Sequence, residues 1–169
     1  MINQLRSLSA IAFAALILAL PARPIAAQDM GIPIGTRPGP AVVRTLDGKP
    51  VDLSRYIGKV PVMIEFWATW CPNCKELMPA LTAAEKKYGK RVKFIVVAVA
   101  INQSPAKVKR YLGAHPQRHE MLFDTDGAAA EAFDAPATSY VVMLDKSGRV
   151  VYTGLGGKQD LDAAVRKGL

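Results

Sequence analysis

The feature that most constrains this chain is a pair of cysteines, Cys71 and Cys74, placed where a strand pattern meets a helical one. Residues 60–67 are almost continuously apolar, as expected of a strand that is buried on both faces. A helix is predicted over residues 71–88, ending at a glycine. Because the first N–H groups of a helix are free, Cys71 lies where they stabilise a thiolate. The pattern therefore points to thiol chemistry at the end of a buried strand.

Two cysteines with two residues between them close only a very short loop, which contributes little to stability. A thiolate, not a thiol, attacks a disulfide, and a C-x-x-C motif lowers the pKa of its reactive cysteine below the usual value of about 8.5. Cys74 lies one helical turn after Cys71, where it can close the disulfide and release a mixed-disulfide partner. We therefore predict a redox-active Cys71–Cys74 disulfide and no further cofactor or resident metal.

The rest of the chain reads as strands and helices built around this unit. A strand–helix–strand segment with apolar strands implies parallel pairing through a right-handed crossover. The prediction is an α/β fold, with a central mixed sheet flanked by helices, an extended lead-in over 28–40 and one domain over 41–169. In chain order the expected elements are a hairpin over 41–53, a strand over 60–67, a helix over 71–88, a strand over 94–101, a helix over 104–113, a strand over 121–123, a helix over 128–133, a hairpin over 140–153 and a helix over 160–167.

The chain resembles the exported TlpA/ResA-like branch of the thioredoxin superfamily, which includes cytochrome c maturation thiol reductases. The residues that carry the resemblance are 46–53, 58–60, 66–74, Pro79 and 145–151. The similarity covers nearly all of residues 41–157 and implies a thioredoxin fold with an added N-terminal β-hairpin. We expect the client-binding residues to be Trp70, Pro72, Asn73, Thr138 and Ser139.

Glu65 is the most informative residue outside the cysteine motif. It lies six residues before Cys71, among apolar neighbours. Thioredoxins carry a buried acid at the equivalent position, so the resemblance implies that Glu65 relays a proton for Cys74. Burial would raise the pKa of this carboxyl, which suits a general base near neutral pH. The alternative is a position at which Glu65 simply reaches water.

The chain departs from this branch in the loop opposite the disulfide, where relatives carry a cis-proline. Counting back from the second hairpin without a gap, the equivalent residue is Ser139. Using Pro136 instead would shift the following strand by an odd number of residues and reverse its faces. A cis bond before a non-proline residue costs about 2.5–4 kcal/mol, so we predict a trans Thr138–Ser139 peptide. The Ser139 hydroxyl is then expected to point toward Cys71.

The first 27 residues have the pattern of a signal peptide. Arg6 precedes an apolar run over 8–20, and small residues at 25–27 offer a cleavage site. The run has 13 residues, whereas a spanning helix needs about 20. An uncleaved anchor, suggested by Arg23 close to the expected cut, is the alternative. We therefore predict a periplasmic or otherwise extracytoplasmic protein, with membrane contact only if this segment is retained.

The formal charge of +8 raises the question of a polyanion partner. The basic residues are scattered, however, over segments such as 86–93 and 107–110, and no run of them alternates with aromatic side chains. We read them as a solvated lysine-rich surface and expect no nucleic-acid partner. A preference for acidic protein partners is a weaker interpretation of the same charge.

The leading functional hypothesis is dithiol–disulfide exchange on protein clients. The resemblance implies a reductant that receives its electrons from a membrane thiol donor. The alternative is a copper(I) or cytochrome-maturation chaperone whose cysteines bind without turnover. A zinc set that adds His115 and His119 is disfavoured, because the gap after Cys74 is long and Pro116 disrupts helical spacing of the histidines.

Overall fold

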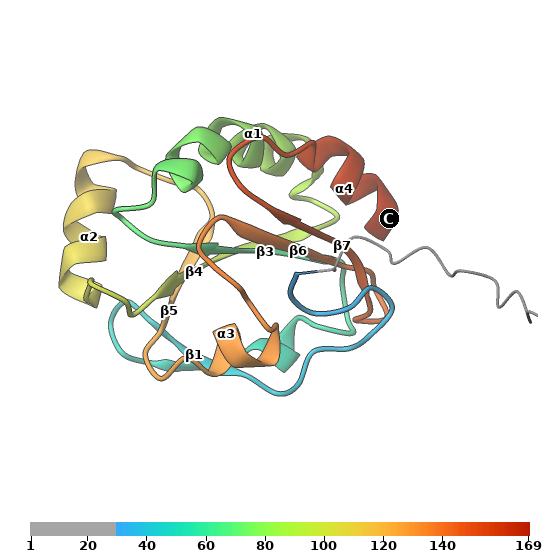
Figure 1. The fold of residues 1–169 in the computed structure, drawn as a ribbon, viewed down its shortest axis with the longest axis horizontal. Helices are drawn as coiled ribbons and strands as arrows, with labels where there is room; N and C mark the ends of the chain where they lie inside the picture. The colour runs from blue at the N-terminus through green and yellow to red at the C-terminus, as the bar shows by residue number, and fades with distance from the viewer. Residues whose placement is uncertain (1–29) are drawn as a thin grey trace, which may run out of the picture.

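A computed structural model describes residues 30–169, so the predicted signal peptide lies outside the described residues. A seven-stranded mixed sheet forms the centre, with the strand order β2-β1-β5-β4-β3-β6-β7. Helices α1 and α4 lie over one face of this sheet, and α3 lies on the other side (Figure 1). The predicted α/β class and thioredoxin-type arrangement are confirmed. Within residues 30–169, no helix has both the length and the apolar character needed to cross a bilayer.

The observed elements follow the predicted order closely. The strands are β1 (Val42–Thr45), β2 (Pro50–Asp52), β3 (Val62–Trp67), β4 (Lys93–Val99), β5 (Glu120–Asp124), β6 (Tyr140–Leu144) and β7 (Val150–Leu155). The helices are the 3-10 turn η1 (Leu53–Arg55) and the α-helices α1 (Pro72–Tyr88), α2 (Pro105–Ala114), α3 (Ala128–Ala132) and α4 (Leu161–Gly168).

Strand β3, helix α1 and strand β4 form the unit that the sequence predicted most strongly. Strands β3 and β4 are parallel, with Glu65 opposite Val96. Every residue of β3 is buried, because β4 and β6 pair with its two edges and helices cover the sheet. Helix α1 begins at Pro72, after residues 68–71, and continues through Pro79 to Tyr88. The end of a buried central strand thus fixes the start of α1.

The N-terminal hairpin is present and is joined to the sheet in a way that the sequence did not reveal. Strands β1 and β2 pair antiparallel, and β1 also pairs antiparallel with β5. The Asp124 carboxylate at the end of β5 accepts hydrogen bonds from the N–H groups of Ala129 (3.1 Å) and Ala130 (2.9 Å). Asp124 therefore has a structural role, because it binds free N–H groups at the start of α3.

The start of the described chain packs against the body of the domain. The Ile32 N–H donates to the carbonyl of Phe133, and Ile32 is buried. Gly35 and Thr36 exchange backbone hydrogen bonds with Val150 at the beginning of β7, at 2.7 and 2.9 Å. The segment 30–40 is thus held across the second hairpin.

Candidate active site

Cys71 and Cys74 form a disulfide at the N-terminus of α1, with their Cα atoms 5.3 Å apart. Cys71 is the N-cap residue, and its Sγ accepts a hydrogen bond from the Cys74 N–H at 3.0 Å. The predicted position of Cys71 at the free end of the helix is confirmed. In the disulfide form Cys71 is 2% exposed and Cys74 is fully buried. An attacking group must therefore approach from the side of Cys71.

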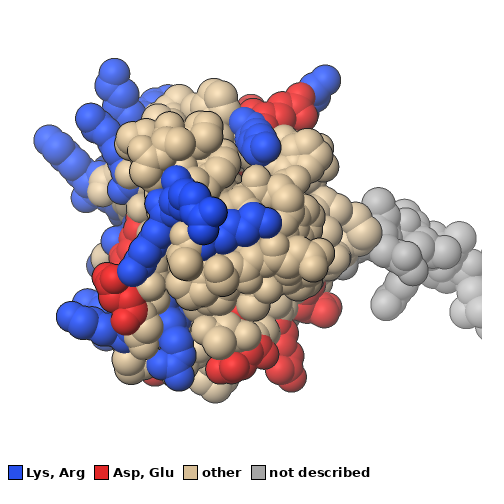
Figure 2. Space-filling view, turned by 90° about the vertical axis from the view of Figure 1, so that its left-hand side faces the viewer, with Lys and Arg blue, Asp and Glu red and all other residues tan. Residues whose placement is uncertain are grey.

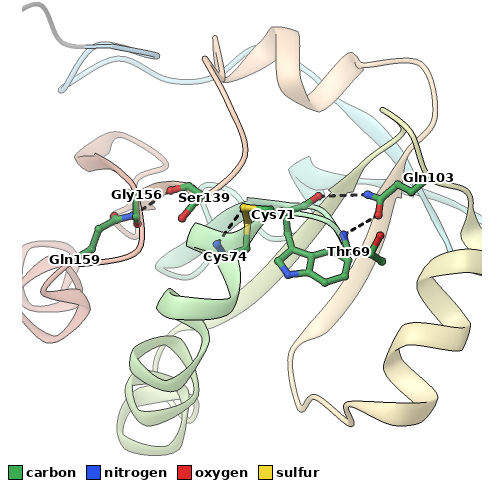
Figure 3. Close-up of a disulfide and its surroundings, with 8 residues drawn as sticks. Thr69, Cys71, Cys74, Gln103, Ser139, Gly156 and Gln159 are labelled. Carbon is green, nitrogen blue, oxygen red and sulfur yellow. Dashed lines mark hydrogen bonds between the residues drawn. A yellow bond between two sulfur atoms is a disulfide. The ribbon is translucent and has the colours of Figure 1, made fainter.

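Gln103 holds the backbone that leads into the motif, a role that sequence reasoning missed. Its side-chain carbonyl accepts from the Thr69 N–H at 2.9 Å (Figure 3). Its side-chain amide donates to the Val99 carbonyl at 2.6 Å. The amide also makes a longer contact, 3.5 Å, with the Trp67 carbonyl. Gln103 thereby ties the ends of β3 and β4 together beside the disulfide. A polar residue just after a buried strand was the only signal in the sequence.

Ser139 lies beside the disulfide, immediately before β6 (Figure 3). Its N–H donates to the Phe66 carbonyl at 2.7 Å, while its carbonyl accepts from the Gly156 N–H at 3.1 Å. Residues 30–169 contain no cis peptide bond, so the Thr138–Ser139 peptide is trans, as predicted. Register places Phe66 opposite Tyr140. Ser139 therefore belongs to the loop that faces the cysteine motif.

The backbone of Ser139 adopts a left-handed conformation, with φ of 65°. Such a φ is uncommon for a residue other than glycine, asparagine or aspartate. The hydroxyl is buried and makes no hydrogen bond in this disulfide form. Ser139 thus combines an unusual backbone with an unsatisfied polar group at the site.

Gln159 supports the same loop and was also missed from sequence. Its side-chain amide donates to the carbonyls of Gly156 (2.6 Å) and Ser139 (3.1 Å). Its own carbonyl accepts from the Tyr152 hydroxyl at 3.0 Å. Gln103 and Gln159 therefore position the two segments that meet at the disulfide, one on each side (Figure 3).

Glu65 is fully buried, and neither of its carboxyl oxygens has a hydrogen-bond partner. Burial raises the pKa of Glu65 to about 8. Side chains alternate along a strand, so Glu65 shares a face of β3 with Trp67, whose ring contacts Tyr111 of α2. Phe66 contacts Phe133 beyond α3, on the opposite face. The alternative in which Glu65 reaches water is wrong, because the side chain is enclosed.

The expected client-binding residues differ in their exposure. Trp70 is 43% exposed, and its ring N–H donates to the Ile101 carbonyl at 2.8 Å. Pro72 and Asn73 are also exposed at the start of α1, whereas Thr138 is half-buried. An accessible rim formed by Trp70, Pro72 and Asn73 therefore borders the nearly buried Cys71.

The two histidines considered for a metal site have other contacts. His119 Nδ1 lies 2.6 Å from a Glu85 carboxylate oxygen, and burial lowers the pKa of His119 although Glu85 opposes this shift. The His115 ring stacks on Tyr111, with centroids 4.4 Å apart. Among residues 30–169, no three His, Cys, Asp or Glu side chains are grouped as metal ligands.

The family model described as Redoxin matches residues 34–167. The chain belongs to the Redoxin family. It is 29% identical over 110 residues to the thiol–disulfide oxidoreductase ResA of Bacillus subtilis, covering 65% of this chain and 60% of that protein. It is 25% identical over 138 residues to the thioredoxin-like protein YneN of the same organism, covering 80% of each chain.

Solved structures show the same fold. One is a putative DsbE thiol:disulfide interchange protein from Chlorobium tepidum, with a TM-score of 0.69, 21% identity, and coverage of 80% of this chain and 95% of that one. A putative thioredoxin from Neisseria meningitidis gives a TM-score of 0.63 with 26% identity and covers 76% and 89% of the two chains. The predicted resemblance to thiol–disulfide oxidoreductases is thereby confirmed at the level of the family.

We predict that Glu65→Gln makes stability less dependent on pH. The unfolded chain releases the Glu65 proton near its usual pKa of 4.5, whereas the folded chain retains it until about pH 8. Folding therefore takes up a proton within this window, and the free energy of unfolding falls as pH rises through it. An amide does not ionise, so the free energy of unfolding of Glu65→Gln should not fall in this way. Relative to the unmodified protein, it should therefore rise by a few kcal/mol between pH 5 and pH 8.

Urea unfolding of the disulfide form across this pH range measures the difference. Glu131→Gln on α3, which replaces an exposed acid, is the matched control and should follow the unmodified protein. Parallel pH profiles for the unmodified protein and Glu65→Gln would show that the carboxyl is ionised in the fold.

We predict that Ser139→Gly is more stable than Ser139→Ala by about 1 kcal/mol, because glycine alone adopts a φ of 65° without steric cost. Both substitutions remove the unsatisfied hydroxyl, so the two variants differ only in the Cβ atom, whose steric cost at this φ should exceed what its packing contributes. Urea unfolding of the two disulfide forms provides the measurement. A more stable alanine variant would contradict the left-handed conformation.

Proposed function

We propose that this protein is an extracytoplasmic thiol–disulfide oxidoreductase that reduces disulfides in protein clients. The observation that carries the proposal is the position of Cys71. Its sulfur caps α1, accepts the Cys74 N–H at 3.0 Å and lies within bonding distance of the Cys74 sulfur. A sulfur in this position is stabilised as a thiolate when the disulfide opens. No cofactor other than this disulfide is required.

The reaction proceeds by two exchanges of sulfur partners. The Cys71 thiolate attacks one sulfur of a client disulfide, and the other client sulfur leaves as a thiolate that takes a proton. Cys74 then loses its proton and attacks the Cys71 sulfur, which releases the second client thiolate. Two electrons pass from the cysteine pair to the client. A membrane thiol donor, included in the proposal by family resemblance, restores the dithiol.

Glu65 is the proposed base for the second exchange. It lies in a strand whose end leads directly to the cysteine motif, and its carboxyl has no competing partner. A base with a pKa of about 8 can accept and return a proton near neutral pH, as this step requires. Burial therefore gives Glu65 the proton affinity that this step needs.

The proposed clients are proteins, contacted through Trp70, Pro72 and Asn73 on one side and Thr138 on the other, with the fully buried Ser139 directly behind Thr138. The rim around Cys71 is open, and the sulfur itself is almost enclosed, so an extended client segment fits better than a bulky folded surface. Export is supported by the leader pattern in the sequence and by similarity to a secreted disulfide oxidoreductase of Mycobacterium tuberculosis, with a TM-score of 0.62 and 21% identity.

We predict that Cys71 is the attacking sulfur. In the reduced protein it should react with iodoacetamide at neutral pH well before Cys74, because it lies at the helix terminus and nearer the surface. Mass spectrometry of peptides after short labelling times gives the order. Earlier labelling of Cys74 would reverse the assignment.

The same assignment is tested with clients. Cys74→Ser should accumulate mixed disulfides with reduction-sensitive links to Cys71, whereas Cys71→Ser should accumulate none. The unmodified protein should reduce insulin in the presence of dithiothreitol. A protein that binds copper(I) tightly but fails to reduce insulin would favour the chaperone alternative.

We predict that Glu65→Gln slows release of the client while the first attack remains fast. The amide cannot accept the Cys74 proton, so the mixed disulfide should persist about 10²-fold longer near neutral pH. Rapid quenching followed by gel analysis separates the two steps. Release rates that match those of the unmodified protein from pH 6 to 9 would make Glu65 a structural residue only.

A further inference from the structure

A groove between α1 and α2 extends away from the active site. Met78 and Pro79 of α1 line one wall, and Tyr111 of α2 with Pro116 lines the other, enclosing about 800 Å³. A second hollow, lined by Trp70, shares Tyr111 and Lys75 with the first. We call these two hollows together the α1–α2 groove. It leads from the exposed Trp70 beside Cys71 along the helical layer.

The apolar part of the groove is built on the core. The Tyr111 ring meets the buried Trp67 ring edge to face, with centroids 5.2 Å apart. His115 stacks on the other side of Tyr111, and its Nδ1 lies 3.1 Å from the Tyr111 carbonyl. Since Trp67 ends the strand that leads to the cysteine motif, this wall is fixed relative to the disulfide.

The groove is also positively charged. Its basic side chains are Lys75, Lys86, Lys107 and Arg110, and no acidic residue lines either hollow. None of these four forms an ion pair within residues 30–169, whereas other surface lysines do pair with acids. Figure 2 looks onto the α2 side of the molecule and shows Lys and Arg side chains over the middle of this face, with acidic side chains mostly toward its margins.

We propose that the α1–α2 groove binds an extended segment of a client protein in which acidic side chains flank an apolar one. This inference rests on the proposed function and specifies its substrate class. The apolar side chain would lie between Met78 and Tyr111, and the carboxylates would meet the unpaired lysines and arginine at the rim. The client cysteine would then lie beyond Trp70, at Cys71.

A polypeptide fits this surface better than a nucleic acid. The cations border a concave apolar surface rather than forming a long stripe that would follow a phosphate backbone. The aromatic rings of the groove, those of Trp70, Tyr111 and His115, do not alternate with the cations as in a base-stacking platform. Opposite charge on client and groove speeds the encounter, and the apolar contact selects the segment. We therefore expect the groove to act on the rate of the first exchange.

The test uses peptides whose single cysteine is joined by a disulfide to 5-thio-2-nitrobenzoate. Cys71 attacks the peptide sulfur and releases the coloured thiolate, so absorbance reports the first exchange. Three peptides are compared: one with acidic residues and a leucine, one with basic residues and the same leucine, and one with acidic residues only. The acidic peptide with leucine should react about tenfold faster than the basic one, and faster than the acidic peptide without leucine.

Charge reversal locates the effect. Lys86→Glu with Arg110→Glu should slow the acidic peptide with leucine about tenfold and speed the basic one. Lys90→Glu with Lys146→Glu makes the same change in net charge at exposed positions outside the groove and should change either rate less than about twofold. If both double variants slow the reaction with the acidic, leucine-containing peptide equally, the effect comes from long-range attraction by net charge and not from the groove, and the proposal is overturned.

The neutral reagent hydroxyethyl disulfide distinguishes a failure of the oxidoreductase function from a failure of the groove assignment. If the reduced protein fails to react with it, the proposed oxidoreductase function is wrong. If it reacts normally but treats the three peptides alike, only the groove assignment is wrong. A single-stranded oligonucleotide can be added so that its phosphate charges match the carboxylates of the acidic peptide in concentration. If it blocks the reaction with that peptide, the groove is a general polyanion surface, and the peptide assignment is overturned.

Discussion

The hydrogen bond from the Cys74 N–H to the Cys71 sulfur is the interaction around which this site is organised. It exists because the fully buried strand β3 ends at Trp67 and, after residues 68–70, Cys71 caps a new helix whose first N–H groups have no helical partners. The first turn of α1 contains no acidic side chain that would compete for these groups. The fold therefore provides a fixed positive environment for a thiolate before any client arrives.

The buried carboxyl of Glu65 shows how function and stability oppose each other in this protein. An unpartnered carboxyl inside a sheet is destabilising, since it must be kept protonated or pay the cost of a buried charge. The same enclosure raises its pKa to about 8, within the range useful for exchange chemistry. Ser139 is a second case, with a left-handed backbone and an unbonded hydroxyl beside the disulfide. Of these two departures from ideal packing, Ser139 lies beside the disulfide, and Glu65 lies in the strand that precedes the cysteine motif.

Two glutamines hold the segments that meet at the disulfide. Gln103 fixes the segment before the cysteines, and Gln159 fixes the loop that contains Ser139. The groove extends this arrangement outward, because Tyr111 rests on Trp67 at the end of the same central strand. The cysteine motif and the apolar wall of the groove are thus both supported by the end of β3.

Local pattern in the sequence determined the helix and strand order, the parallel β3–α1–β4 unit and the position of Cys71 as helix cap. These features depend on apolar periodicity and on residues near each other in the chain, which a sequence displays directly. Resemblance added the expectation for Glu65 and the register that led to Ser139. Each could be located by counting because a strand allows no single-residue shift.

Tertiary structure alone decided the rest. The pairing of β1 with β5, the roles of Gln103 and Gln159, and the meeting of α1 with α2 to form a basic groove all join residues far apart in the chain. Polar side chains such as these have many possible partners, and only packing selects one. Some of the lysines that look scattered in the sequence line a single groove, because helix packing brings them together without acids between them.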